Sequence, residues 1–273
     1  MKIPVRLPYT AFWTVFVLTT DFWNYIDGSC NVNVGYERDA AFDGVVPMPA
    51  WYYINSIPNL SFASCTLACF QSVSVCSGYL FSSQHSSCKL LRTFLTHIDR
   101  NGSYIGGDWE YRSRSTENLS LNKSVTASSN FMDHYSYHVD FKWSYLVDGI
   151  TFAHGKFATW FEPYPWATID LARYSIIKNV IIFNRVDDHG DWIHNLEIRV
   201  GNSFVWTEMT TCGTYPEPSE TGAIFTVECR PSRYGRYVTL KIVLRSYITD
   251  DSNANNGNNV LVLEEVVVNG LNV

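Results

Sequence analysis

The sequence predicts a mainly β protein, in which a small disulfide-rich α+β domain precedes a C-terminal β-sandwich of the jelly-roll type. Three observations predict this fold class. Five of the seven cysteines lie between residues 30 and 88. From residue 118 onward, apolar and polar residues alternate in short runs without helical periodicity. The polar stretch YRSRSTENLS (111–120) separates these regions and is typical of a linker, so we place the boundary near Ser115 and the domains at 29–113 and 114–273.

The N-terminal segment, residues 1–28, has the layout of a secretory signal peptide. Lys2 and Arg6 precede an apolar run at residues 11–18, which is too short to span a membrane. A small-x-small cleavage site does not follow clearly. The sequence therefore places the cleavage site only within the range from Thr19 to Ser29, and a signal anchor is the alternative. We expect a secreted, extracellular protein.

Composition agrees with secretion. Four glycosylation sequons begin at Asn59, Asn101, Asn118 and Asn122. The cysteines form two clusters, which fits an oxidising compartment and a separate disulfide set in each domain. The formal net charge is −6 and the chain contains no basic run, so the sequence argues against nucleic acid or acidic lipid as a partner.

The first domain is expected to contain one helix, at residues 61–71 (SFASCTLACFQ). Ser61 suits the N-cap position, and Cys65 and Cys69 lie one turn apart on the same helical face. The runs CSGYLFSS and CKLLRTF that follow are typical of strands. The sequence alone leaves several cysteine pairings open.

The segment SCTLACFQSVSVCSGYLFSSQHSSCKLL resembles the PAN/apple module cysteine by cysteine. The resemblance implies the disulfides Cys65–Cys88 and Cys69–Cys76, and a module that contacts proteins or glycans. The apple form also joins its two ends by a disulfide, but no cysteine lies near residue 110, where a partner for Cys30 is expected. Cys30 is therefore either a free or mispaired thiol or the site of a bridge to a second chain.

The second domain contains six strand-like runs joined by turns. These runs are NLSLNKSVTASS, WATIDLARYSIIKNVIIFNR, LEIRVG, FTVEC, GRYVTLKIVL and VLVLEEVVVNG. They predict a β-sandwich or jelly roll in which one face of each strand is buried. The loops at the ends of such a sandwich are where function is expected.

These phrases, in this order, resemble the F-type lectin (fucolectin) domain over residues 118–273. The opening and closing phrases are shared with discoidin-like, coagulation-factor C-type modules, and they imply a galactose-binding-like jelly roll. A Cys212–Cys229 pair and an Arg-x-Asp loop favour the F-type branch. That branch implies recognition of terminal fucose or a related sugar.

The sugar motif of fucolectins is a His, then 26 residues, then Arg-x-Asp-x4-Arg or Lys. Arg185 and Asp187 match its Arg and Asp, whereas Ala158 and Trp192 stand at the other two positions. A guanidinium presents several fixed donors to sugar hydroxyls, and a neighbouring carboxylate orients it. Loss of the two other donors is expected to weaken fucose binding by roughly one to several orders of magnitude, and so to alter specificity.

Two residues offer compensation for the lost donors. His154 lies four residues before Ala158, and Trp192 offers a flat apolar face with an indole N–H. Each candidate contact also has a purely structural interpretation. These are a turn-stabilising ion pair for Arg185 and Asp187, loop packing for Trp192, and simple solvation for His154.

The resemblance further implies a structural calcium ion beneath the binding loops. The carboxylate ligands of the family match Asp148 and Glu265. The carbonyls of Tyr145, Ile150 and Glu264 would complete an all-oxygen shell, which is what a hard cation needs. The alternative is that Asp148 only forms an Asx turn.

The sequence shows no arranged acid, base or nucleophile, and the pattern of His134 and His138 does not match a zinc motif. We therefore expect a secreted, non-catalytic, calcium-supported carbohydrate-binding protein. The alternative is an extracellular adhesion, matrix or protein-interaction protein with a degenerate sugar site. Because single sugar sites bind weakly, we also expect an assembly with several sites, formed through Cys30 or the first domain.

Overall fold

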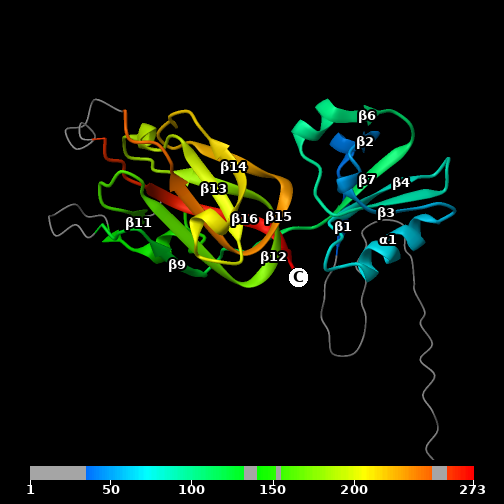
Figure 1. Cartoon of the computed structure of the whole chain (residues 1–273), viewed down its shortest axis with the longest axis horizontal. Coiled ribbons are helices and arrows are strands. Elements are labelled where there is room, and N and C mark those ends of the chain that lie inside the picture. Colours follow the sequence, from blue (N-terminus) through cyan, green and yellow to red (C-terminus); the bar gives the residue numbers. More distant parts are fainter. Residues whose placement is uncertain (1–34, 132–139, 152–154, 248–256) are drawn as a thin grey trace, which may run out of the picture.

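The computed structural model describes residues 35–131, 140–151, 155–247 and 257–273. Within these ranges the chain forms two β-rich units that are joined near Ser115 (Figure 1). The predicted signal peptide, Cys30, His134, His138 and His154 lie outside the described residues. No helix in the described ranges is long and apolar enough to cross a bilayer.

The N-terminal unit is a five-stranded antiparallel sheet in the order β1-β7-β4-β5-β3, against which one helix packs. Strands β2 and β6 form a separate two-stranded sheet. The strands are β1 (Tyr36–Arg38), β2 (Val45–Pro47), β3 (Tyr53–Ile57), β4 (Gly78–Ser82), β5 (Ser87–Leu91), β6 (Ser103–Ile105) and β7 (Trp109–Arg114). The helices are η1 (Ala40–Phe42), η2 (Ala50–Tyr52), α1 (Phe62–Gln71) and η3 (His97–Gly102).

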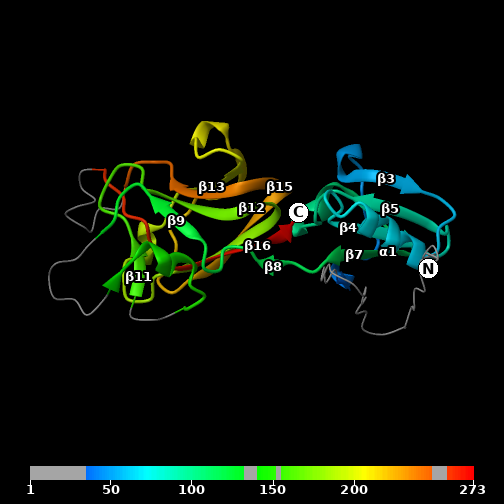
Figure 2. The same ribbon diagram turned by 90° about the horizontal axis from the view of Figure 1, so that it is seen from below.

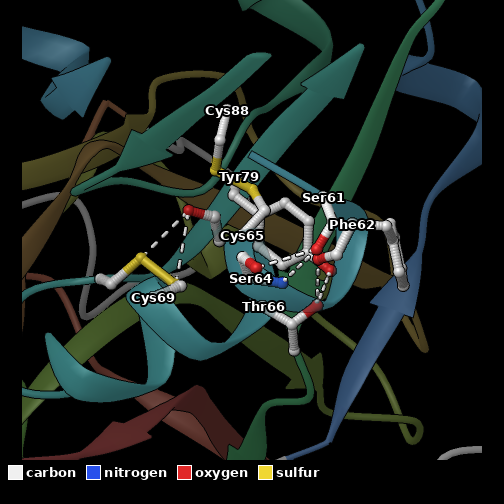
Figure 3. The surroundings of a disulfide bond; sticks show 10 residues. Ser61, Phe62, Ser64, Cys65, Thr66, Cys69, Tyr79 and Cys88 are labelled. Atoms are coloured by element: carbon white, nitrogen blue, oxygen red, sulfur yellow. Dashed lines mark hydrogen bonds between the residues drawn. A yellow bond between two sulfur atoms is a disulfide. The ribbon is translucent and has the colours of Figure 1, made fainter. Parts of the chain in front are cut away.

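Helix α1 begins where the sequence predicts. The hydroxyl of Ser61 accepts a hydrogen bond from the backbone N–H of Ser64 (3.2 Å), which caps the helix. The hydroxyl of Thr66 lies 2.6 Å from the phenol oxygen of Tyr79, a fully buried residue of β4 (Figure 3). This polar contact fixes the helix over the sheet at a point where Tyr79 would otherwise bury an unpaired hydroxyl.

The described residues form three disulfides, in the pairs that the two resemblances imply: Cys65–Cys88, Cys69–Cys76 and Cys212–Cys229. The first joins α1 to β5, and the second joins α1 to the turn that follows it (Figure 3). The third joins β14 to β15 in the C-terminal unit. Each cross-link reduces the conformational entropy of the unfolded chain, which matters most in the N-terminal unit because its core is small.

The C-terminal unit is a β-sandwich with the strand order β10-β11-β16-β12-β15-β13-β14, in which β8 pairs with β16 and β9 with β12. Its strands are β8 (Glu117–Asn118), β9 (Ser124–Ala127), β10 (Asp140–Phe141), β11 (Gly155–Ala158), β12 (Trp166–Asn184), β13 (Leu196–Gly201), β14 (Thr210–Tyr215), β15 (Ile224–Ile242) and β16 (Val262–Asn272). Three 3-10 turns are η4 (Trp143–Val147), η5 (Gly190–Trp192) and η6 (Trp206–Glu208).

Strands β12 and β15, of 19 residues each, pair antiparallel along most of their length. The register of β12 is interrupted at two places, between Asp170 and Ser175 and between Ile177 and Asn179. The first part of β12 also pairs with β9, and its second part also pairs with β16. The inward-facing aliphatic residues of both long strands contribute to one large core.

The mainly β prediction is confirmed, but several boundaries differ. FTVEC and GRYVTLKIVL form the single strand β15. The predicted linker at 111–120 is largely strand, because it contains the end of β7 and all of β8. Strands β10, β11 and β14 are missing from the predicted runs. In β14 the reason is clear, since Cys212 is its one buried side chain and its sequence TTCGTY shows no apolar alternation.

The four sequons differ in exposure. Asn59, Asn101 and Asn122 are exposed. Asn118 is half-buried, and its Oδ1 accepts hydrogen bonds from the backbone N–H and the hydroxyl of buried Ser120 (3.0 and 2.7 Å). Glycosylation remains a prediction for all four, with Asn118 the least accessible to a modifying enzyme.

The two units meet at a tight joint. Phe94, which follows β5, packs against Ile176 of β12 and Leu271 of β16, and all three are buried. Thr93 Oγ1 donates to Ser232 Oγ (3.0 Å), and the backbone N–H of Ser232 donates back to Thr93 Oγ1 (2.8 Å). The joint is therefore apolar at its centre and hydrogen-bonded at its edge.

A buried carboxylate adds a charged contact across the joint. Asp99 of η3 accepts hydrogen bonds from the Tyr52 hydroxyl and from the backbone N–H and hydroxyl of Thr96. Its Oδ1 also lies 3.0 Å from Nε of Arg230 in β15. The fixed orientation of Asp99 in the N-terminal unit thus sets the position of Arg230 in the other.

Replacing Phe94 by Ala should leave a cavity between the units and lower the free energy of unfolding by about 3 kcal/mol. Denaturant titration measures this change. Leu67→Ala, on the exposed side of α1, is the control and should change the same quantity by less than about 0.5 kcal/mol. Equal effects of the two substitutions would show that Phe94 does not hold the units together.

Candidate functional site

Five charged side chains contact one another where β11, β16 and the loop after β12 meet. Figure 1 shows β11 at the end of the sandwich that lies away from the N-terminal unit. We call these five side chains the polar cluster: Lys156 of β11, Arg185, Asp187 and Asp188 of the loop after β12, and Glu264 of β16. The loop between β12 and β13 thus meets two other strands here. It is the loop in which the sequence places the sugar motif.

The guanidinium of Arg185 is held from one side by two aspartates. Its Nε and Nη2 donate to the two carboxylate oxygens of Asp187 (2.8 and 2.9 Å), and Nη2 also lies 2.7 Å from Oδ1 of Asp188. The Arg185 side chain is only 12% exposed. Within the described chain, no hydrogen bond uses Nη1. A fixed fork with free donors is what recognition of a polar ligand requires.

Lys156 is a member of the cluster that the sequence motif does not reveal. Its ammonium lies 2.7 Å from Oδ2 of Asp187 and 3.5 Å from Oε1 of Glu264, and the side chain is almost fully buried. Lys156 lies two residues before Ala158, the position of the motif His, so both side chains point to the same face of β11. Its position two residues before Ala158 is a weak sequence signal, because its contact with Glu264 depends on the long-range pairing of β11 with β16.

The two cations set the charge state of Asp187. Burial of this carboxyl opposes ionisation, but hydrogen bonds from Arg185 and Lys156 outweigh it and hold the pKa of Asp187 well below its ordinary value. In contrast, burial raises the pKa of Glu264, although the charge of Lys156 counters the rise. Asp187 is therefore a permanent anion between two cations.

Trp192 in η5 is enclosed by its neighbours. The His189 ring stacks on the indole (4.6 Å between centroids, 12° between planes), and the Arg185 guanidinium lies 4.8 Å from the ring centroid. Phe161 makes an edge contact with the indole at 5.4 Å. Trp192 thus acts mainly as a packing residue that supports Arg185 by a cation–π contact, and it presents little open face for a sugar.

A small hollow of about 180 Å³ borders the cluster beyond Trp192. Its lining residues are Phe161, Trp192, Ser246, Asn258, Asn259 and Val260. This volume includes space open to solvent, so the hollow is shallow and any ligand bound here would stay largely exposed.

The predicted calcium ligands lie behind the polar cluster, on the other face of β16. Glu265 is buried, and its Oε2 accepts a hydrogen bond from the backbone N–H of Gly149 (3.2 Å). Its Oε1 has no hydrogen-bond partner. The Asp148 carboxylate accepts a hydrogen bond from the N–H of Ile150 (2.8 Å), which is the Asx turn that the sequence offers as the alternative to a calcium ligand. An unpaired buried carboxylate oxygen near a second carboxylate suits an oxygen-preferring cation.

The described ranges contain no group of three or more His, Cys, Asp or Glu side chains arranged as a metal site. The predicted shell uses only Asp148 and Glu265 as side-chain ligands, and it depends on backbone carbonyls for the rest. Calcium accepts such carbonyl ligands. The residues present therefore fit a calcium ion in donor chemistry, and calcium binding remains a prediction.

Residues 145–240 match the family model of the NedA-like, galactose-binding domain. The chain carries a galactose-binding-like domain. The matched range contains Arg185, Asp187 and Trp192, whereas Glu264 and Glu265 lie beyond it. None of the curated proteins matches the chain. The PAN/apple resemblance of the N-terminal unit stays a prediction.

Several solved structures resemble the galactose-binding-like domain. The fucolectin from Morone saxatilis (striped bass) serum has a TM-score of 0.46 and 23% identity, and the match covers 57% of this chain and 50% of that one. This chain thus spans about half the length of that fucolectin. The lectin domain of lectinolysin complexed with Lewis B antigen has a TM-score of 0.42 and 22% identity, covering 56% of this chain and 96% of that one. Chitosan-binding module 1 from a Paenibacillus sp. IK-5 chitosanase/glucanase has a TM-score of 0.41 and 22% identity, and the match covers 56% of this chain and 98% of that one.

Stability should fall as pH rises, because of Glu265. Burial, aided by the charge of Asp148, raises the pKa of Glu265 from 4.5 to about 8. Between these values the folded state holds a proton that the unfolded chain has released, so the free energy of unfolding decreases with pH. In wild type, Glu265 should lower the free energy of unfolding by on the order of 4 kcal/mol between pH 4.5 and about 8, and the Glu265→Gln variant should lack this fall. Denaturant titrations at several pH values, with chelator present, measure the free energy of unfolding of both proteins. If it depends on pH in the same way in wild type and in Glu265→Gln, Glu265 is not the group responsible.

Replacing Lys156 by Met should lower the free energy of unfolding by about 3 kcal/mol, because Glu264 would lose its ion pair while remaining buried. The double variant Lys156→Met/Glu264→Met removes both charges and should recover most of that loss. A double-mutant cycle from denaturant titrations measures the coupling. Purely additive losses would mean that the two side chains do not interact.

Proposed function

We propose that this protein is a secreted, non-catalytic lectin that binds a terminal sugar at the polar cluster of its galactose-binding-like domain. The match of residues 145–240 to a galactose-binding domain and the position of the cluster around the loop after β12 support the proposal. The observation that carries it is the Arg185 guanidinium, which two aspartates orient while leaving Nη1 without a partner in the described chain. Building such a fixed donor is costly unless a ligand uses it.

The sugar is fucose or a related pyranose with an altered pattern of hydroxyl contacts. Ala158 supplies no donor, and the indole N–H of Trp192 is buried among protein atoms. Lys156 is buried as well, so it orients Asp187 rather than contacting the ligand. Arg185 thus provides most of the binding energy, and neutral hydrogen bonds of about 1 kcal/mol each add little.

Calcium supports this site from behind. Asp148 and Glu265 would hold the ion, with carbonyls of Tyr145, Ile150 and Glu264, and the ion would neutralise the buried Glu265 carboxylate. Glu264 and Glu265 are neighbours on β16 and point to opposite faces of the strand. A calcium ion bound by Glu265 would therefore also hold in place Glu264, which faces Lys156. Chelation is therefore expected to weaken sugar binding without abolishing the fold.

A glycan array with and without chelator tests the proposal on wild type, Arg185→Ala and the control Arg173→Ala. Arg173 is exposed and lies at a distant bend of β12. Wild type and the control should bind the same fucosylated or galactosylated glycans, and Arg185→Ala should lose at least about tenfold in signal. Absence of signal from wild type on every such glycan, with calcium present, would overturn the lectin proposal.

The second candidate is an extracellular adhesion or protein-interaction protein whose sugar site no longer functions. The enclosure of Trp192 by His189 and Arg185 favours it, because the site then lacks an open apolar face for a sugar ring. Under this candidate the array stays blank. Replacing the exposed loop residue Trp160 by Ala would then weaken binding of a protein partner.

A further inference from the structure

A second hollow lies on the outward face of the C-terminal sandwich, distinct from the polar cluster. It is a shallow hollow of about 290 Å³, a volume that includes space open to solvent. We call it the aromatic groove: Trp166 and Thr168 of β12, Thr239 and Lys241 of β15, and Phe204 and Trp206 of the segment around η6. Figure 2 shows that segment (yellow) standing above β12, β13 and β15. None of the six residues belongs to the polar cluster.

Strand register places the floor of the groove side by side. Trp166 pairs with Lys241 across β12 and β15, and Thr168 pairs with Thr239 in the same way. The two threonine hydroxyls lie 2.6 Å apart. A bond between two hydroxyls uses one of their two hydrogens, so one donor remains for a ligand at the centre of the floor.

The walls of the groove are flat and apolar. Phe204 is 58% exposed, and its ring packs against Tyr237 at 4.0 Å between centroids. Arg199 lies 4.3 Å from the centroid of the Trp206 ring and also donates to the Trp206 carbonyl (3.2 Å), which fixes that wall. Rigid aromatic walls around a polar floor suit a ring that is apolar on its faces and polar at its rim, as a pyranose is.

Lys241 gives the groove its charge preference. Its ammonium lies 5.3 Å from the Trp206 ring and 5.9 Å from the Tyr164 ring, and the described chain shows no ion pair for it. The nearest carboxylate in the strand register is Glu197, directly across from Lys241 on β13. Glu197 Oε1 is already held by Arg199 (2.6 Å) and Thr211 (3.0 Å). The groove therefore presents a cation whose countercharge a ligand would supply.

We propose that the aromatic groove binds an acidic pyranose, that is, a sugar ring bearing a carboxylate or sulfate. The ring lies against Phe204 and Trp206, a ring hydroxyl contacts Thr168 and Thr239, and the acidic group pairs with Lys241. The groove is shallow, so a single sugar ring would rest against it with one face in solvent. The groove does not depend on Arg185, so this inference stands whether or not the polar cluster binds sugar.

NMR titration of the tryptophan indole N–H signals tests the proposal on the full chain. The probes are methyl β-D-glucuronide, galactose 6-sulfate and the neutral methyl β-D-glucoside, each added to about 10 mM because single sugar sites are weak. At least one acidic probe should shift the signals of Trp166 and Trp206 and leave that of Trp192 unchanged. The neutral glucoside should bind at least about tenfold more weakly.

Three variants locate the contact. Lys241→Gln should weaken the acidic probe by at least about tenfold and leave the glucoside unaffected, whereas Lys123→Gln, a matched loss of charge outside the groove, should change neither. Phe204→Ala, at an exposed position, should weaken all probes without unfolding the protein. Arg185→Ala should leave groove binding intact. Equal affinity of wild type and Lys241→Gln for the acidic probes, or no shift of Trp166 and Trp206 with any of them, would overturn the proposal.

Discussion

The long antiparallel pairing of β12 with β15 is the constraint on which the rest of the molecule depends. Near the start of β12, this pairing sets Trp166 beside Lys241 and builds the floor of the aromatic groove. Near the middle of β12, the same pairing places Ile176 and Ser232 in contact with the N-terminal unit. Where β12 ends, the chain enters the loop that holds the polar cluster. Groove, joint and loop therefore share one scaffold, and a shift of register would displace all three.

The sequence predicted best what short-range chemistry determines. The Ser61 cap and the spacing of Cys65 and Cys69 locate α1, since a cap and a helical face depend only on neighbouring residues. Arg185 and Asp187 were also identified, because two residues in one turn meet in any fold that forms the turn. The helix prediction is confirmed, and Arg185 and Asp187 do contact each other, whereas their role in sugar binding stays a prediction.

Long-range pairing was harder to predict. The joining of two runs into β15 and the formation of β14 depend on partner strands that a local pattern does not show. Lys156 was missed for the same reason, since only the approach of β11 to β16 brings it to Glu264. Trp192 had two interpretations until the packing of Phe161 and His189 against it was known.

Glu264 and Glu265 show how adjacent residues acquire different roles. Consecutive side chains of a strand point to opposite faces, so one glutamate meets Lys156 while the other faces Gly149. Burial raises the pKa of both. A single strand thereby connects the electrostatics of the polar cluster with those of the predicted calcium position.

The joint at Phe94 also determines how the molecule would work on a surface. Ile176 lies at the joint, and Asn184, the last residue of β12, leads into the loop of the polar cluster, so the second half of β12 separates the joint from the cluster without a flexible tether. A flexible tether lets a second contact search a broad volume, whereas a rigid spacer favours only partners at the matching distance. If the N-terminal unit binds a partner, as its resemblance to the PAN/apple module implies, the protein would select pairs of partners by their spacing as well as by their chemistry.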